Sequence, residues 1–346
     1  MAERVVVAVD FGEPSIAAAR WVAQHFSRGD ELVLVHVLHV PPVPRYLEGR
    51  YPSGDRLVDT AKRGAETRLR DLIQSIATTL VWPEVRVGTP DEVIVRVAAE
   101  YGASIIVVGR STPSSGLWAR LGTTAQRVLR ASSVPVLLAA GLPAREPAHV
   151  LVAVDESDMT SAVLRWGQLL ATRYSAVATA VHVVTVPLFV GASVVSTGGA
   201  SPADERDVHE ADRWLVQRLQ DSTLGGMTPT VVAGPVRPAD AILEEATRRR
   251  AELIVMGSRG AGAVRRFFVG SVAEAVLERA RCPVLVVPPE AAAASGEIVG
   301  TEWPGLPRDA ARGTGRPFDR VADASIDSFP ASDSPSWTGL RVGPPR

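Results

Sequence analysis

Short apolar runs alternate with longer stretches of mixed polarity along most of the chain. The runs VVVAV, LVLVHV and SIIVV are continuously apolar and rich in β-branched residues. Such runs are typical of parallel strands that are covered on both faces. The stretches between and after them, at 15–26, 59–76 and 90–102, have the composition and length of helices. This alternation predicts a doubly wound α/β fold with right-handed crossovers.

The same pattern occurs twice. RVVVAVD at 4–10 returns as HVLVAVD at 149–155, and SIIVVG at 104–109 returns as ELIVMG at 252–257. Further runs repeat in the same order, with an offset that stays between 145 and 148 residues. Several matched runs in one order indicate a tandem duplication.

The duplication predicts two domains, 1–143 and 147–290, joined by the Gly- and Pro-rich segment GLPAREPA. Residues 291–346 lack lasting periodicity and are rich in Gly, Pro, Ala, Ser and Asp. They predict a disordered, low-complexity tail. The pattern W-x-G-L occurs in it twice, at Trp303 and Trp337. It is either a coincidence of composition or a repeated docking motif.

Composition narrows the classes of partner. The net charge is −1 and aromatic residues are only 5%, which argues against a nucleic-acid or polybasic membrane binder. Cys282 is the single cysteine, so one chain cannot form a disulfide framework or a cysteine metal site. We interpret it as a small buried residue. No run approaches the ~18 apolar residues of a membrane span, and the first residues lack signal-peptide features, so we expect a cytoplasmic protein.

A glycine-rich stretch, MGSRGAGAVRRFFVGSVAE at 256–274, lies between an apolar run and a helix-like run. Glycine lets backbone N–H groups approach a phosphate and permits positive φ, and a helix N-terminus adds unpaired N–H groups. Arg259, Arg265 and Arg266 add cationic side chains. The stretch therefore predicts an anion cradle; the alternative is a tight turn with solvated arginines.

The spacing of this stretch is more specific than its composition. Gly-x-x-Gly, nine residues and then Gly-Ser, together with a strand-end Asp, a V-H-V strand and C-P-V-L-V-V, resembles the nucleotide motif of the universal stress protein family. The resemblance covers both repeats, about 290 of 346 residues. It implies a five-stranded parallel sheet of order 3-2-1-4-5 in each domain. It also implies a cytosolic stress-response regulator that binds ATP, with or without Mg²⁺.

For the second repeat, the resemblance implies that Asp155 and the backbone of Val183 hold the adenosine end. It implies that the ribose and phosphates are lined by Met256, Gly257, Arg259, Gly260, Gly270, Ser271 and Val272. Position alone leaves two interpretations of Asp155. A carboxylate at a strand's carboxyl end either accepts hydrogen bonds from a ligand or caps the following turn.

The first repeat keeps most of the motif and implies a weaker site. Its corresponding residues are Asp10, Val37, Gly109, Thr112, Gly122 and Thr123. Thr112 stands where the second repeat has Gly260, and Pro113 removes one further N–H donor. If the loop needs positive φ there, a β-branched residue is unfavourable. This repeat therefore binds nucleotide weakly, binds another ligand, or serves only as a pairing partner.

In the family the last strand lies at the sheet edge, and an exposed apolar edge invites pairing. We therefore expect the runs VPVLLAA and CPVLVVP to join the two lobes as an intramolecular pseudo-dimer. Assembly of two chains into a four-lobed homodimer is compatible with this arrangement.

Neither catalytic nor metal-binding residues are predicted. The chain contains no P-loop and no G-x-S-x-G motif, and strand alternation puts His36 and His39 on opposite faces. We expect these histidines and His182 to be packed or hydrogen-bonded, and ATP to be bound without turnover. Two alternatives remain. One is slow ATP hydrolysis or autophosphorylation, for example at Ser258 or Ser271. The other is an interaction protein that acts through its tail without nucleotide.

Overall fold

The computed structural model describes residues 4–26, 31–39, 54–76, 80–110, 121–185, 202–221, 226–260 and 269–294. The elements of the first lobe are, in chain order, β1 (Arg4–Ala8), α1 (Glu13–Trp21), the π-helix η1 (Val22–Phe26), β2 (Glu31–Leu38), α2 (Gly54–Ile76), β3 (Leu80–Val87), α3 (Pro90–Glu100), β4 (Ile105–Gly109), α4 (Thr123–Ala131) and β5 (Val136–Ala139).

The second lobe repeats this order. Its elements are β6 (His149–Val154), α5 (Thr160–Tyr174), β7 (Val177–Thr185), α6 (Pro202–Asp221), β8 (Met227–Gly234), α7 (Pro238–Arg248), β9 (Leu253–Gly257), α8 (Ser271–Arg279), β10 (Val284–Val287) and α9 (Pro289–Ala294).

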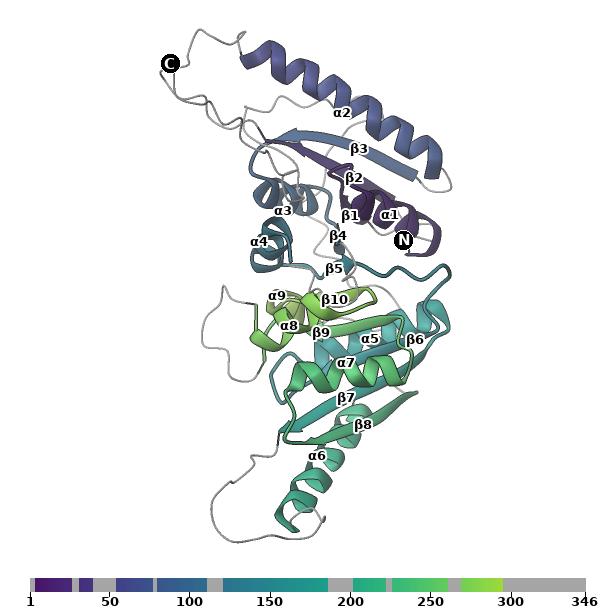
Figure 1. The fold of residues 1–346 in the computed structure, drawn as a ribbon, viewed down its shortest axis with the longest axis vertical. Coiled ribbons are helices and arrows are strands. Elements are labelled where there is room, and N and C mark those ends of the chain that lie inside the picture. Colours follow the sequence, from purple (N-terminus) through teal and green to yellow (C-terminus); the bar gives the residue numbers. More distant parts are fainter. Residues whose placement is uncertain are drawn as a thin grey trace, which may run out of the picture.

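The described strands form one sheet in the order β3-β2-β1-β4-β5-β10-β9-β6-β7-β8 (Figure 1). Pairing is parallel within each lobe, and β5 and β10 pair antiparallel where the lobes meet. Each half therefore has the order 3-2-1-4-5, as the family resemblance implied.

An approximate two-fold axis passes between β5 and β10. Leu137 pairs with Leu285, its counterpart 148 residues later, and both side chains are fully buried. The flanking pairs are crossed, Leu138 with Val284 and Val136 with Val286, as an isologous contact requires. Helices α4 and α8 face each other beside this seam in Figure 1.

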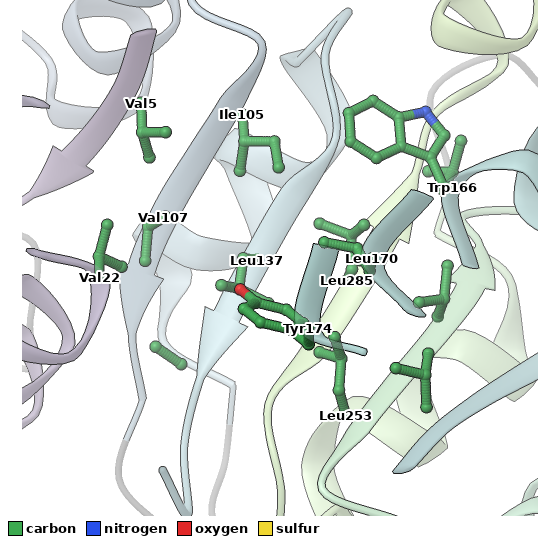
Figure 2. Close-up of a cluster of buried hydrophobic side chains, with 14 of the residues drawn as sticks. Val5, Val22, Ile105, Val107, Leu137, Trp166, Leu170, Tyr174, Leu253 and Leu285 are labelled. Atoms are coloured by element: carbon green, nitrogen blue, oxygen red, sulfur yellow. The ribbon is translucent and has the colours of Figure 1, made fainter. Parts of the chain in front are cut away.

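Two apolar cores run through both lobes, one on each face of the sheet. One face is covered by α1, α2, α5 and α6, and the other by α3, α4, α7 and α8. On the first face, Val107 and Leu137 lie in one cluster with Leu285 and Leu253 of the second lobe (Figure 2). The alternating side chains of β5 and β10 thus contribute to both cores.

The linker between the lobes begins at a glycine for a steric reason. Gly141 has a φ of +56°, and a Cβ there would lie 1.8 Å from the carbonyl oxygen of Arg281. No other residue type fits both conditions.

The predicted tail begins within α9, which extends to Ala294. Pro289 at the first helical position and the run of alanines that follows both favour helix. The remainder of the tail, 295–346, including both W-x-G-L patterns, lies outside the described residues. None of the helices that are described has the length and apolarity needed to cross a bilayer.

Candidate functional site

The predicted site residues of the second lobe meet at one edge of the sheet. β6 pairs with β9, with Ala153 opposite Met256. Asp155 follows the last residue of β6, and Gly257 is the last residue of β9, so the two lie at neighbouring carboxyl ends. The chain leaves β6 toward β7 on one side and returns to β9 on the other. Ligands in open α/β sheets bind at such a switch point.

Asp155 begins a tight turn that leads into α5. Its Oδ1 accepts hydrogen bonds from the backbone N (3.2 Å) and Oγ (2.6 Å) of Ser157. Thr160 Oγ1 donates to the carbonyl oxygens of Asp155 and Ser157. Oδ1 of Asp155 thus makes the hydrogen bonds that the turn-capping interpretation requires. The sequence D-x-S is typical of such a turn, and the sequence analysis did not use it.

The other oxygen of Asp155 faces the glycine loop. A Cβ built on Gly260 would lie 2.7 Å from Asp155 Oδ2, well inside van der Waals contact. A larger residue at 260 would therefore require the carboxylate of Asp155 to move. Gly260 does not have a φ in the left-handed region, so the condition of positive φ at this position is not met.

The two ends of the glycine loop are held together. The N–H of Gly270 donates to the carbonyl of Ser258 (2.8 Å), and the N–H of Ser258 donates to the carbonyl of Val287 in β10 (2.9 Å). Residues 261–268 between them, with Arg265 and Arg266, lie outside the described residues. This closure brings the start of α8 to the end of β9, beside Asp155.

Accessibility separates the candidate side chains. Gly260 and Ser271 are exposed, and Arg259 is partly exposed. By contrast, Ser258 is buried, and the side chain of Met256 belongs to the core. Met256 therefore offers only its backbone to a ligand, and Ser258 is a poor phosphate acceptor.

Three further predicted residues flank this edge. Gly257 ends β9, and a Cβ there would lie 3.2 Å from the carbonyl oxygen of Arg259. Val183 lies near the end of β7, partly buried against the core, and Val272 lies in the first turn of α8, also against the core. The side chains of Val183 and Val272 pack against the core, and polar groups at all three positions come from the backbone.

In the first lobe, the strand-end carboxylate also accepts a backbone and a serine hydrogen bond from its own turn. Asp10 Oδ1 accepts from the N–H of Gly12 (2.7 Å) and from Ser15 Oγ (2.5 Å). Gly109 at the end of β4 lies against the start of α1, where a Cβ would be 2.6 Å from the backbone of Pro14 and Ser15. Helix packing alone therefore accounts for Gly109.

The first lobe retains the helix start of the motif. Gly122 precedes α4 with φ −59° and ψ 147°, and a Cβ there would meet nothing within 4 Å. Thr123 is exposed, whereas the side chain of Val37 is buried in β2. Thr112 and Pro113 lie outside the described residues.

A histidine supports the strand-end turn in each lobe. His36 Nδ1 lies 2.7 Å from the carbonyl oxygen of Val9, and His182 Nδ1 lies 3.1 Å from that of Val154. A carbonyl only accepts, so Nδ1 carries the proton in both rings. Burial lowers the pKa of His36, and the hydrogen bond to Val9 opposes that effect. Both histidines are therefore hydrogen-bonded structural residues, as expected.

The described residues contain no group of three or more His, Cys, Asp or Glu side chains that could hold a metal ion. Cys282 is buried, and burial raises the pKa of its thiol to about 12, so it stays protonated. The chemistry of the site therefore consists of backbone N–H groups, one carboxylate and one arginine, which suits binding of a phosphorylated ligand.

Comparison with known proteins gives one family. The profile described as "Universal stress protein family" matches residues 1–140 and 147–288. A universal stress protein of Mycobacterium tuberculosis is 29% identical over 301 residues, which covers 82% of this chain and 96% of that protein. Another, from Methanocaldococcus jannaschii, is 31% identical over 140 residues, covering 40% of this chain and 80% of that protein.

A solved structure has the same fold. The crystal structure of a universal stress protein from Archaeoglobus fulgidus superposes with a TM-score of 0.58 at 20% identity. The match covers 82% of this chain and 98% of that one, so the similarity includes both lobes.

Proposed function

Because the chain belongs to the universal stress protein family, we propose that its second lobe binds ATP between Asp155 and the loop from Gly257 to Ser271. In this proposal the chain is a cytosolic stress-response regulator that acts by binding nucleotide rather than by turning it over. Asp155 and Val183 hold the adenosine end, and the start of α8 with Gly260 and Arg259 holds the phosphates.

One observation carries the proposal. A Cβ on Gly260 would lie 2.7 Å from Asp155 Oδ2, and the N–H of Gly270 donates to the carbonyl of Ser258, so three predicted parts of the motif lie near one another. The N-terminus of α8 is presented there with exposed Ser271. Its N–H groups and dipole favour a phosphate, and a partly exposed arginine adds a counter-charge.

The same geometry favours binding over catalysis. Catalysis requires a nucleophile that reaches the reacting phosphate and a general base that is positioned to take the nucleophile's proton. Ser258 is buried, and both strand-end carboxylates accept hydrogen bonds from their own turns. Bound Mg²⁺ would be held chiefly by the ATP phosphates themselves. Incubation with γ-labelled ATP separates binding from hydrolysis and from transfer to Ser271.

Replacing Gly270 by valine tests the site. Gly270 has φ −64° and ψ 148°, which any residue adopts, and a Cβ there makes ordinary contacts of 3.5 Å. The variant should fold, while the valine methyl groups fill the space at the helix start. We expect Gly270→Val to weaken ATP binding at least tenfold by calorimetry, a loss of about 1.4 kcal/mol.

Gly122→Val is the matched control, because Gly122 holds the same place before α4 with a similar backbone and open space around it. It should leave the affinity of the second lobe unchanged. Equal ATP affinity of Gly270→Val and the parent chain would show that the site is assigned to the wrong place. Mass spectrometry of small molecules released from the purified chain identifies the nucleotide directly.

A further inference from the structure

A buried arginine of the first lobe reaches the end of a helix in the second lobe. Arg110 directly follows β4, and only 6% of the residue is exposed. Its Nη2 donates to the carbonyl oxygen of Ala280, the residue that caps α8, at 2.6 Å. Burial lowers the pKa of the guanidinium to about 10, which leaves it charged at neutral pH. A positive charge is therefore held at the carboxyl end of α8.

The other end of α8 is the one at which the proposed site holds phosphates. The helix runs for nine residues, from Ser271 to Arg279. At 1.5 Å per residue it is about 14 Å long. The peptide dipoles make the N-terminus of a helix positive and its C-terminus negative, so a cation beside the C-terminus is favourable. Arg110 and the ligand phosphates would thus lie at opposite ends of one short helix.

Hydrogen bonds to other elements fix both ends of α8. At the start, the N–H of Gly270 donates to the carbonyl of Ser258, which follows β9. At the far end, the carbonyl of Ala280 accepts from Arg110. Between them, Val276 is fully buried in the core. A shift of the carboxyl end would therefore turn the helix about its packed middle and displace the N–H groups at its start.

A neutral residue occupies the corresponding place in the other half of the molecule. The approximate two-fold relates Ala280 to Ser132, the residue that caps α4. It relates Arg110 to Ser258. A serine hydroxyl is short and uncharged, so it cannot support the dipole of α4 as the guanidinium supports that of α8. This difference favours the second lobe for binding an anion.

Building on the function proposed above, we propose that Arg110 is a positioning residue for the nucleotide site of the opposite lobe. It fixes the carboxyl end of α8 and supports the dipole of that helix, so that the N–H groups at its start bind the phosphates of ATP. The first lobe thereby contributes to a site whose ligand contacts lie in the second. Because the effect acts on phosphates, it should be large for ATP and nearly absent for adenosine.

The test compares Arg110→Met with Arg110→Lys in the full chain. Methionine keeps much of the side-chain length but has neither the charge nor the donor, whereas lysine keeps both. By calorimetry, we expect Arg110→Met to weaken ATP binding about fivefold and to leave adenosine binding unchanged. A fivefold loss corresponds to about 1 kcal/mol, which is within the range of a charge at a partly buried helix terminus. Arg110→Lys should restore most of the ATP affinity.

Trp21→Phe is the matched control for a loss of stability alone. Trp21 Nε1 donates to the carbonyl of Pro143 at 3.0 Å, and the residue lies on the opposite face of the sheet from α8. This variant should be less stable than the parent and bind both ligands equally well. Melting curves define a temperature at which every variant is folded. If Arg110→Met does not fold, Arg110→Gln replaces it, because glutamine is also uncharged.

Hydrogen exchange without nucleotide tests the position of α8 directly. Arg110→Met should speed exchange in peptides that cover residues 270–280 more than in peptides of α7. Unchanged exchange there overturns the proposal, and so does an ATP affinity equal to that of the parent. Equal losses for ATP and adenosine, or an Arg110→Lys variant no better than Arg110→Met, also overturn it. A parent chain that binds no ATP contradicts the proposed function instead, and hydrogen exchange then still decides whether Arg110 positions α8.

Discussion

At the scale of single residues, His36 gives the structure a pH dependence. Burial lowers the pKa of its imidazole from the usual 6.5, and Arg68 lowers it further, while the hydrogen bond to Val9 and the charge of Asp10 oppose the shift. Below pH 6.5 the imidazole of His36 therefore binds a proton more readily in the unfolded chain than in the folded chain. Stability falls as the pH falls through this range.

We expect the free energy of unfolding, measured with urea between pH 8 and pH 5, to decrease toward acid. In His36→Asn the amide can still donate to Val9 but does not titrate, so the decrease should be smaller than in the parent. Comparison of the two at pH 8 isolates the packing loss from titration. His149, whose pKa burial also lowers, leaves a residual slope in both. An unchanged slope in the variant would mean that His36 is not the responsible group.

The candidate site shows which residue-level features could be predicted from the sequence. The spacing of Gly257, Gly260 and Gly270 pointed to the loop, but the backbone of Gly260 does not have positive φ. The nearness of Asp155 to position 260 joins residues 105 positions apart and depends on the order of the strands. Phe11 has a left-handed backbone with a φ of +65°, which could not be predicted either, because its ring packs against His36 of β2 and Arg68 of α2.

At the scale of elements, the continuous apolar runs predicted the strands because parallel strands covered on both faces are apolar throughout. The outer strands differ, since β3 and β8 each carry a proline at the same place, Pro83 and Pro229. Proline cannot donate to a further strand, so both free edges of the sheet resist extension. The seam between the lobes instead uses β5 and β10, which are buried along their whole length.

Arg110 joins the first lobe to the second across this seam. Its side chain is buried, and Nη2 donates to the carbonyl of Ala280, at the end of α8, at 2.6 Å. Burial lowers the pKa of the guanidinium to about 10. Burying the charged group therefore costs free energy, and the hydrogen bond to Ala280 offsets part of that cost. Sequence reasoning could not find this bond, because its partners are 170 residues apart.

Truncating Arg110 to alanine should leave the Ala280 carbonyl without this donor and open a space at the seam. We expect Arg110→Ala to lower the free energy of unfolding by about 1–3 kcal/mol, measured by urea titration. Ser258→Ala is the matched control, since Ser258 occupies the same place after β9 and is also buried. It removes only a hydroxyl and should cost less. An Arg110→Ala variant as stable as the parent would show that the seam does not depend on this bond.

At the scale of the whole molecule, the two lobes share their cores. Leu137 and Leu285 pair across the seam, and the cluster around them extends from Val5 to Leu253 (Figure 2). Separating the lobes would expose a four-residue apolar strand at a new sheet edge in each fragment. Such an edge is a template for pairing with any strand of similar sequence.

Fragments 1–143 and 147–290, expressed separately, should therefore self-associate rather than remain monomeric. The crossed pairs around Leu137 and Leu285 can form equally between two copies of one lobe, because the approximate two-fold relates equivalent positions. Mixed together, the fragments should form a one-to-one complex in preference to either self-associated form. In that complex Arg110 again faces the carbonyl of Ala280, a contact that two copies of the second lobe cannot make because Ser258 replaces the arginine. Light scattering after size exclusion measures each mass. A different outcome would contradict this prediction: fragments with native circular dichroism that stay monomeric and do not associate when mixed. It would mean that the seam forms only when the linker holds the two lobes together.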